Sequence, residues 1–279
     1  MDKSKKYKFI CGNAFKHSCR YSVGKYHDSR RHDFEFKIKK EIDNNLVFIK
    51  TEYTADFFRY INMDYPFSVV THNSDITIDE NFLPFIENKK VNRWYGQNIN
   101  INHEKVTPVP IGLANPKWPH GNQETLFSIQ EENISKDKLL YVNFDKYTNL
   151  GERQKCLEET GIELEKKIDF ESYLREVARS YFVLSPNGNG IDCHKHWEAF
   201  YLNAIPVVSN SINVDYFVKR GLPFLVVNEW SAFKNITLSP ELYKKIWKNF
   251  DPNFLNFNNY FWRHVIQSKS CSNFNVGKI

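Results

Sequence analysis

The stretch FVLSPNGNGIDCHKHWEAFYLNAIPVVSN, from Phe182 to Asn210, decides the fold of this chain. Its first residues form an apolar run typical of a buried strand, and the glycines that follow indicate a loop. The segment HKHWEAFYL has a helical pattern, and IPVVS is a second apolar run. Strand, loop, helix and strand in this order predict a parallel α/β sheet with right-handed crossovers.

The loop and the first turn of the expected helix are unusually polar. A helix amino terminus offers unpaired N–H groups and a partial positive charge to a phosphate, and glycines let the backbone approach it closely. The alternative is that Asp192 only caps the helix and that the glycines only turn the chain. Taken together, the polar groups favour a nucleotide-type site. Its candidate residues are Ser185, Asn187, Gly188, Asn189, Gly190, His194, Lys195 and Glu198.

Two of these residues have specific expected roles. Lys195, in the first turn, would add a cation beside a diphosphate. Glu198 follows it by three residues on the same helix face, where a carboxylate can accept hydrogen bonds from a ribose diol. His194 and His196 raise the possibility of zinc, but histidines two residues apart on a helix point in different directions, so no metal site is predicted.

Composition and charge restrict the class of protein. The chain has 279 residues, of which 41% are hydrophobic, enough for one large domain or two of ordinary size. Its net charge of +5 suits a phosphate-bearing ligand, but the lysines and arginines are dispersed, so nucleic-acid binding is not expected. The five cysteines include no C-x-x-C pair, and no apolar run approaches the ~20 residues of a membrane span. We therefore predict a soluble cytoplasmic protein without a membrane span.

Apolar runs and turn signals outline the rest of the chain. A polar, charged segment at residues 128–138 is the best candidate linker. It separates two α/β runs, which we interpret as an N-terminal domain at residues 1–130 and a C-terminal domain at 131–279, with the last helices able to pack back on the first domain. Strands are expected at residues 6–12, 45–50, 66–75, 92–99, 106–113, 139–144, 182–185, 205–209 and 222–228, and helices at 54–61, 152–161, 170–180, 192–202, 239–250 and 257–267.

The segment SPNGNGIDCHKHWEAFYLNAIPVV resembles the donor-binding segment of exostosin-like glycosyltransferases. Within that family, the small Asn- and Lys-rich chain is most similar to N-glycan xylosyltransferase-type enzymes of large algal viruses, which would act in the cytoplasm of the host cell. The similarity covers about Tyr141 to Asn228 and is weaker in VVTHNSD, RWYGQN and VPIGLAN. It implies the glycosyltransferase-B architecture, two Rossmann-like domains facing a cleft, with Glu198 on the nucleotide ribose and Lys195 near the diphosphate. Lys195 stands where many relatives have arginine, and a lysine cannot contact a phosphate through two parallel hydrogen bonds.

The function expected from this resemblance is transfer of a sugar, with xylose the best guess, from a UDP-sugar to a hydroxyl of a glycan or glycoprotein. Inverting transfer needs a general base, and the best candidate is Asp75 at the polar end of strand 66–75, with His72 second. Arg153 and Asn143 follow the first strand of the second domain and are further candidates for donor binding. For Asp75 the alternative is a turn or helix cap, and for Arg153 it is a solvated helix residue.

Trp94 and Tyr95, with Asn98, are the candidates for an acceptor platform, because aromatic faces stack on sugar rings; the alternative is packing in the core. The chain contains no D-x-D triplet, so no metal or other cofactor is expected. A dehydrogenase would need a G-x-G-x-x-G loop after its first strand, and the loop near Gly12 lacks it. An inactive sugar- or nucleotide-binding protein is the alternative that the sequence leaves open.

Overall fold

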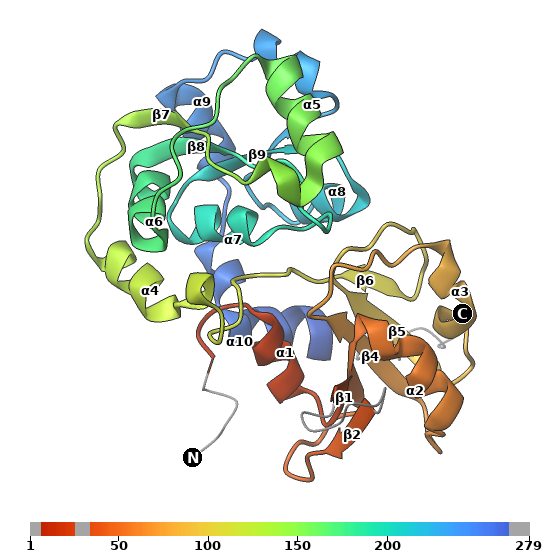
Figure 1. The fold of residues 1–279 in the computed structure, drawn as a ribbon. Helices are drawn as coiled ribbons and strands as arrows, with labels where there is room; N and C mark the ends of the chain where they lie inside the picture. The colour runs from red at the N-terminus through yellow and green to blue at the C-terminus, as the bar shows by residue number, and fades with distance from the viewer. Residues whose placement is uncertain (1–6, 26–33, 268–279) are drawn as a thin grey trace, which may run out of the picture.

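The computed structural model of the chain describes residues 7–25 and 34–267, which form an α/β fold with two sheets (Figure 1). The strands are β1 (Tyr21–Lys25), β2 (Phe34–Ile38), β3 (Leu46–Lys50), β4 (Phe67–His72), β5 (Val91–Gly96), β6 (Val106–Pro108), β7 (Lys138–Tyr141), β8 (Ser180–Leu184), β9 (Ile205–Ser209) and β10 (Leu225–Val227). The helices are α1 (Gly12–Ser18), α2 (Thr54–Tyr60), α3 (Leu83–Ile86), α4 (Gln123–Glu131), α5 (Leu150–Thr160), α6 (Phe170–Arg179), α7 (His194–Tyr201), α8 (Ile212–Val218), α9 (Pro240–Trp247) and α10 (Phe257–Tyr260). The α/β prediction is confirmed.

The first sheet is mixed and has six strands in the order β2-β1-β3-β4-β5-β6, with β2 antiparallel to β1 and the other pairs parallel. Successive side chains of a strand point to opposite faces. In β4, Val69 accordingly packs in a cluster with residues of α2 and α3, and Val70 packs in a cluster with residues of α1 and α10. Both faces of this sheet are therefore covered, and its central strands are apolar on both sides.

The second sheet has four parallel strands in the order β10-β9-β8-β7. One face packs against α6 and α7 through Leu174, Val177 and Trp197. The other face packs against α5, α9 and a 3-10 helix at Trp230–Asn235. Helix α5 ends at Gly161 with φ of 70°, the left-handed conformation that glycine adopts without strain.

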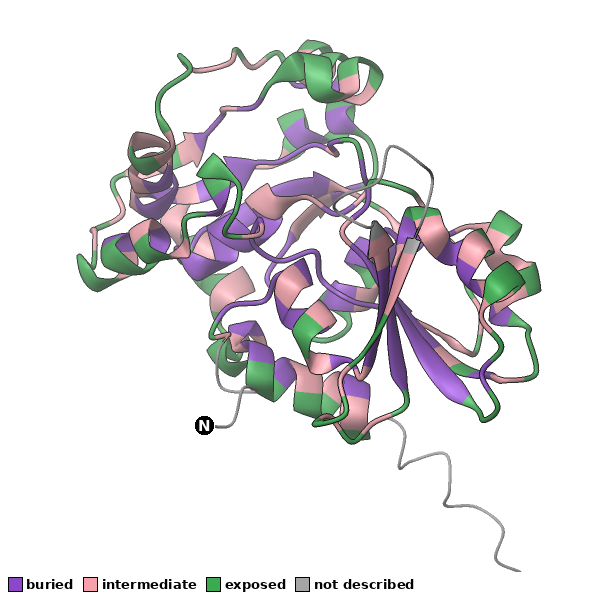
Figure 2. Ribbon diagram, turned by 60° about the horizontal axis from the view of Figure 1, so that its bottom comes forward, coloured by how far each residue is buried: buried purple, intermediate pink, exposed green. Residues whose placement is uncertain are grey.

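The end of the described chain returns to the first sheet. The backbone N–H of Phe257 donates to the carbonyl of Lys8 at 3.0 Å, and the Tyr95 hydroxyl donates to the carbonyl of Val265 at 3.1 Å. Phe15 of α1 meets Phe257 edge to face, with ring centroids 5.2 Å apart. One continuous apolar cluster therefore includes residues of both sheets and of α10, and the buried residues run through the middle of the molecule (Figure 2).

Two predicted elements are wrong. Residues 6–12 form no strand in the part that is described; Phe9 and Cys11 make isolated bridges to Asn256 and Leu113, and α1 begins at Gly12. The predicted linker at 128–138 begins inside α4, which buries Leu126 and Ile129. No helix in residues 7–25 and 34–267 combines the length and the apolar character needed to cross a membrane.

Candidate functional site

Loops from the carboxyl ends of both sheets meet in one region. The loop after β8 contacts three loops of the first sheet: Asn189 Nδ2 donates to Asp75 at 3.2 Å, the N–H of Asp192 donates to Asn98 Oδ1 at 3.0 Å, and the N–H of Ile111 donates to the Asp192 carboxylate at 2.7 Å. In parallel α/β sheets ligands bind beyond the carboxyl ends of the strands. The predicted donor-binding loop and the predicted base are thus neighbours in space, although they are 114 residues apart in sequence.

Helices α6 and α7 bring together a polar cluster of Tyr173, Lys195 and Glu198, of which the first two are half-buried. The Tyr173 hydroxyl donates to Glu198 Oε2 at 2.7 Å, and Lys195 Nζ donates to that hydroxyl at 3.2 Å and to the carbonyl of Asn143 at 2.5 Å. Glu198 is only 6% exposed. Burial lowers the pKa of Lys195 to about 8, while burial and the Glu198 carboxylate raise the pKa of Tyr173 well above its ordinary value. The cluster places a cation and a carboxylate side by side under the loop.

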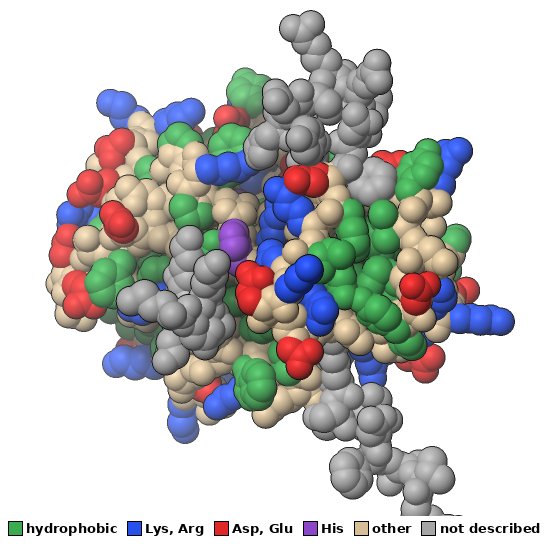
Figure 3. Space-filling model, turned by 90° about the horizontal axis from the view of Figure 1, so that it is seen from below, with side chains coloured by type: hydrophobic (Ala, Val, Ile, Leu, Met, Phe, Trp, Pro, Cys, Tyr) green, Lys and Arg blue, Asp and Glu red, His purple; other side chains and the backbone are tan. Residues whose placement is uncertain are grey.

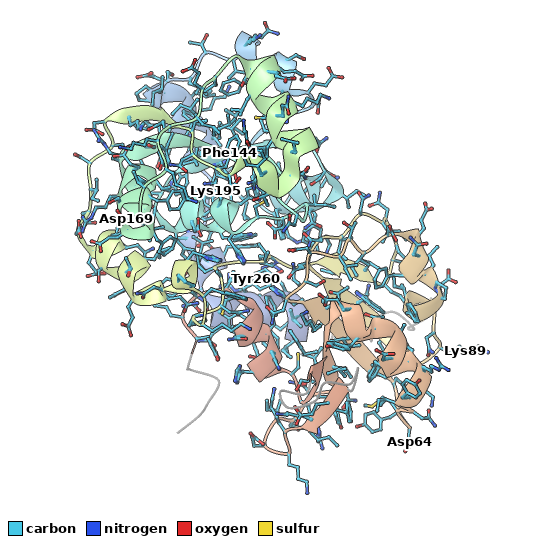
Figure 4. All side chains as sticks on the ribbon, viewed as in Figure 1. Asp64, Lys89, Phe144, Asp169, Lys195 and Tyr260 are labelled. Atoms are coloured by element: carbon cyan, nitrogen blue, oxygen red, sulfur yellow. The ribbon has the colours of Figure 1, made fainter. Side chains whose placement is uncertain are left out.

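Arg153 joins the loops after β7 and β8, and Asn143 lies in the first of these loops. Arg153 Nε donates to the carbonyl of Asn187 at 3.0 Å, and its Nη1 donates to the carbonyl of Asp145 at 2.5 Å. Asn143 Nδ2 donates to the carbonyl of Lys166 at 3.1 Å. Arg153 is buried, so its reading as a solvated helix residue is wrong. Its guanidinium lies beside Gly188 of the glycine loop, and its charge helps to lower the pKa of Lys195, which Figure 4 labels.

The two glycines of the loop face the protein itself. A Cβ at Gly190 would lie 2.5 Å from Asn98 Nδ2, and a Cβ at Gly188 would lie 3.1 Å from Arg153 Nη2. Gly190 therefore allows the loop to pack against the first sheet, which corrects the expectation that its missing side chain leaves room for a phosphate. Nearby, the Ser185 hydroxyl is buried and has no hydrogen-bond partner among the described residues.

His194 and Asp192 also connect this loop region to the first sheet. His194 Nδ1 contacts the carbonyl of Gly112 at 2.7 Å. Asp192 does not simply cap α7, whose N-cap is Cys193. Its carboxylate accepts from the N–H of Ile111 and from Trp197 Nε1 at 2.9 Å, and both partners are buried. Sequence reasoning missed this role because Ile111 is 81 residues away.

His72 cannot serve as an accessible base. It is 1% exposed, and its Nδ1 accepts from the N–H of Asn73 at 2.7 Å while Nε2 donates to the carbonyl of Pro110 at 3.1 Å. Burial lowers the pKa of His72 to about 4, so the ring is neutral at neutral pH. Asp75, in contrast, is exposed, three residues beyond the end of β4, and contacts the donor-side loop through Asn189.

The predicted acceptor platform is wrong. Trp94 and Tyr95 are both 0% exposed, because β5 lies within the sheet and successive side chains enter the apolar clusters on its two faces. Asn98 is buried too, with φ of 55°, and its side chain contacts Ser74 and Asp192. These three residues hold the first sheet and the loop after β8 in place and offer no surface to a sugar.

An asparagine network lies at the carboxyl end of β4 and was not predicted. Asn115 Oδ1 accepts from the N–H of Asn13 at 2.8 Å, and its Nδ2 donates to Asn73 Oδ1 at 2.8 Å. Asn73 has φ of 61°, a conformation that asparagine tolerates better than most residues. In the sequence, the network is indicated by an asparagine that follows a histidine at the end of an apolar strand.

Within residues 7–25 and 34–267, no group of three or more His, Cys, Asp and Glu side chains is placed to hold a metal ion. Figure 3 shows the face seen from below Figure 1, where lysine and arginine side chains gather near the middle beside a histidine. Neither a scan against protein-family models nor a search of curated proteins finds a match to this chain. A function for this chain is therefore inferred from the geometry of the site itself.

Proposed function

We propose that this protein is a glycosyltransferase that moves a sugar from a UDP-sugar to a hydroxyl of a glycan acceptor, with inversion and without a metal ion. In this proposal residues 1–130 and 131–279 are Rossmann-like domains of a glycosyltransferase-B architecture, with the active site between them. Xylose remains the best guess for the sugar. What supports the proposal is the meeting of loops from the carboxyl ends of both sheets at the start of α7.

The observation that carries the proposal is the cluster of Lys195, Tyr173 and Glu198, in which the Glu198 carboxylate is buried. Tyr173 occupies Oε2 of Glu198, and Oε1 would accept hydrogen bonds from the ribose hydroxyls. Lys195, Arg153 and the amino terminus of α7 would stabilise the negative charge that develops on the diphosphate as it leaves. Asp75, which follows β4 of the first sheet, would take the proton of the acceptor hydroxyl. The hydroxyl oxygen would attack the anomeric carbon of the sugar while the bond from that carbon to the diphosphate breaks.

The test is nucleotide binding by the variant Glu198→Gln. Removing the charge of a buried hydrogen-bond acceptor costs about 1–3 kcal/mol, so we expect calorimetry to show UDP affinity reduced by roughly 5- to 150-fold. The purified protein should also hydrolyse or transfer from one of UDP-xylose, UDP-glucose, UDP-galactose and GDP-sugars offered in parallel.

Glu158→Gln is the matched control, because Glu158 is an exposed glutamate on the outer helix α5. It should leave UDP binding unchanged. A folded Glu198→Gln variant with wild-type UDP affinity would contradict the proposed site. A wild-type protein that binds UDP but turns over none of these donors would favour the inactive nucleotide-binding alternative.

A further inference from the structure

A small hollow lies where the end of the chain leaves the second sheet. It is lined by the turn after α8, the loop after α9, α10 and the terminal π-helix Phe261–Ile266. The turn and the loop abut, because a Cβ at Gly221 would lie 3.8 Å from the carbonyl oxygen of Asn249. The hollow measures about 230 Å³. Sites for drug-sized ligands measure about 300–1,000 Å³, so this one suits a single small group.

Three basic side chains from separate parts of the chain line this hollow. Arg220 belongs to the turn after α8, and Arg263 and His264 belong to the π-helix. Burial, and then the charges of Arg220 and Arg263, lower the pKa of His264. Both guanidinium charges therefore act on the same imidazole, so the three groups converge although they are far apart in sequence.

The side chain of Arg220 is held by an aromatic ring. Its guanidinium carbon lies 3.5 Å from the centroid of the Tyr216 ring, the separation of a guanidinium that lies flat on the ring. In that arrangement the N–H groups point outward in the guanidinium plane and can donate to an acceptor. Within residues 7–25 and 34–267, Arg220 forms no ion pair with a carboxylate.

One carboxylate, that of Asp251, also lines the hollow, and it already has partners. Its Oδ1 accepts from the backbone N–H and from Nδ2 of Asn253, both at 2.9 Å. Its Oδ2 is 3.9 Å from Arg263 Nη1, which is too far for a hydrogen bond, and both side chains are exposed. Two arginine charges thus face one carboxylate, and the remaining positive charge favours an anion.

Uncharged groups complete the lining. Asn249 and Asn259 contribute side-chain amides, which can donate hydrogen bonds. Tyr260, labelled in Figure 4, is 1% exposed, and its hydroxyl has no hydrogen-bond partner in the described part of the chain. A buried polar group of this kind commonly has a water or an ion as its partner. Guanidinium, imidazole and amide groups around a small space are the donors that an oxyanion needs.

We propose that this hollow binds a phosphate group through Arg220, Arg263 and His264. A tetrahedral phosphate presents oxygens to donors that approach from several elements, whereas a planar carboxylate presents only two oxygens. This site goes beyond the proposed transferase and does not depend on it, because none of its lining residues belongs to the loop after β8 or to the Lys195 cluster. A bound phosphate would join the turn after α8 to the terminal helices and so stabilise the folded chain.

The test is binding of inorganic phosphate and of glycerol 3-phosphate, a phosphate monoester, by the full-length protein. Calorimetry gives the affinity and thermal unfolding gives the stabilisation, with sodium chloride at the same ionic strength as the control for screening. The variants are Arg263→Ala, Arg220→Ala and Arg220→Lys. Arg59→Ala is the matched control, because Arg59 is an exposed arginine on α2 whose guanidinium carbon lies 5.2 Å from the centroid of the Tyr60 ring.

We expect wild type and Arg59→Ala to bind phosphate equally, with affinity reduced at least about tenfold in Arg263→Ala and Arg220→Ala. Arg220→Lys should lose less, because lysine keeps the charge but cannot form two parallel hydrogen bonds. Phosphate should raise the Tm of wild type more than that of Arg263→Ala. Tighter binding of glycerol 3-phosphate than of phosphate would support a site for a phosphate monoester, and the reverse would support a site for the free anion.

Arg263→Ala is the decisive variant, because its side chain is exposed and its removal should leave the fold intact, as thermal unfolding without phosphate checks. Unchanged phosphate affinity in Arg263→Ala, equal stabilisation of wild type by chloride, or no phosphate binding by wild type would each overturn the site. Saturating UDP that abolishes phosphate binding would place the phosphate in the proposed donor site and overturn it too. Phosphate binding through Arg263 by a protein that binds no UDP would support this site and contradict the proposed transferase.

Discussion

Glu198 differs from the other carboxylates of this region in how its charge is balanced. It is nearly buried, yet it has a phenolic donor in Tyr173 and a lysine beyond that donor. A buried charge without such partners would cost several kcal/mol, so the three residues must be considered together. These hydrogen bonds would also stabilise a carboxylate with a purely structural role. The role of Glu198 is therefore tested by UDP binding and not by the stability of the variant.

Asp75 is the residue whose catalytic role is most directly testable. General-base assistance is typically worth about 10²–10⁴ in rate, so Asp75→Asn should lower kcat of sugar transfer by that range while UDP affinity stays at the wild-type value. The measurement is steady-state transfer from the best donor, together with calorimetry of UDP binding.

Asp64→Asn is the control for this substitution, since Asp64 is an exposed aspartate in the loop before β4, at the opposite end of that strand from Asp75 (Figure 4). Transfer by Asp75→Asn at the wild-type rate would place the base elsewhere. His72 would not be the next candidate, because it is buried and its two ring nitrogens are already engaged.

At the scale of elements, the local patterns of the sequence predicted most of the strands and helices. Apolar runs predicted β3, β4 and β8, and Gly161 predicted the end of α5. The errors arose where a partner far away in the chain decides the outcome. Residues 6–12 have the composition of a strand but no sheet neighbour beyond isolated bridges, and α4 is helical in a polar segment because two apolar residues find a core to enter.

Helix α7 is the element on which the expected electrostatics depend. Its first turn carries Lys195, and its amino terminus contributes a partial positive charge, so a diphosphate bound there would be stabilised without a divalent cation. We expect sugar transfer to continue at an unchanged rate in excess EDTA, measured by release of UDP. Adding magnesium or manganese to dialysed protein should not raise the rate. Activity that disappears in the chelator and returns with manganese would show that a metal ion stabilises the diphosphate instead.

At the scale of the whole molecule, Asp192 links the two sheets. It belongs to the loop after β8, and its carboxylate satisfies a buried backbone N–H of the connection that follows β6. The sequence could predict the loop and the helix, because both are local, but not this contact or the burial of Trp94. Whether a tryptophan is covered depends on which strand it occupies and on what packs against both faces of the sheet.

Removing the Asp192 carboxylate leaves Ile111 N–H and Trp197 Nε1 as buried donors without acceptors. Each such donor costs about 1–3 kcal/mol, so we expect Asp192→Ala to lower the free energy of unfolding, measured by urea denaturation, by about 2–6 kcal/mol, and Asp192→Asn to lower it by less. Asp215→Ala, at an exposed carboxylate that forms an ion pair with Lys219, should change it by less than about 1 kcal/mol. Equal unfolding midpoints for Asp192→Ala and wild type would refute this link.

The return of α10 and the π-helix to the first sheet has a consequence for biosynthesis. Phe15 and Tyr95 lie within the first hundred residues, but Phe257 and Val265, which contact them, are translated after the strands of both sheets. On the ribosome, the face of the six-stranded sheet that α1 and α10 share therefore stays partly uncovered until all four strands of the other sheet have emerged. The later-made sheet has its own helices on both faces and can fold first, so the order of folding need not follow the order of synthesis.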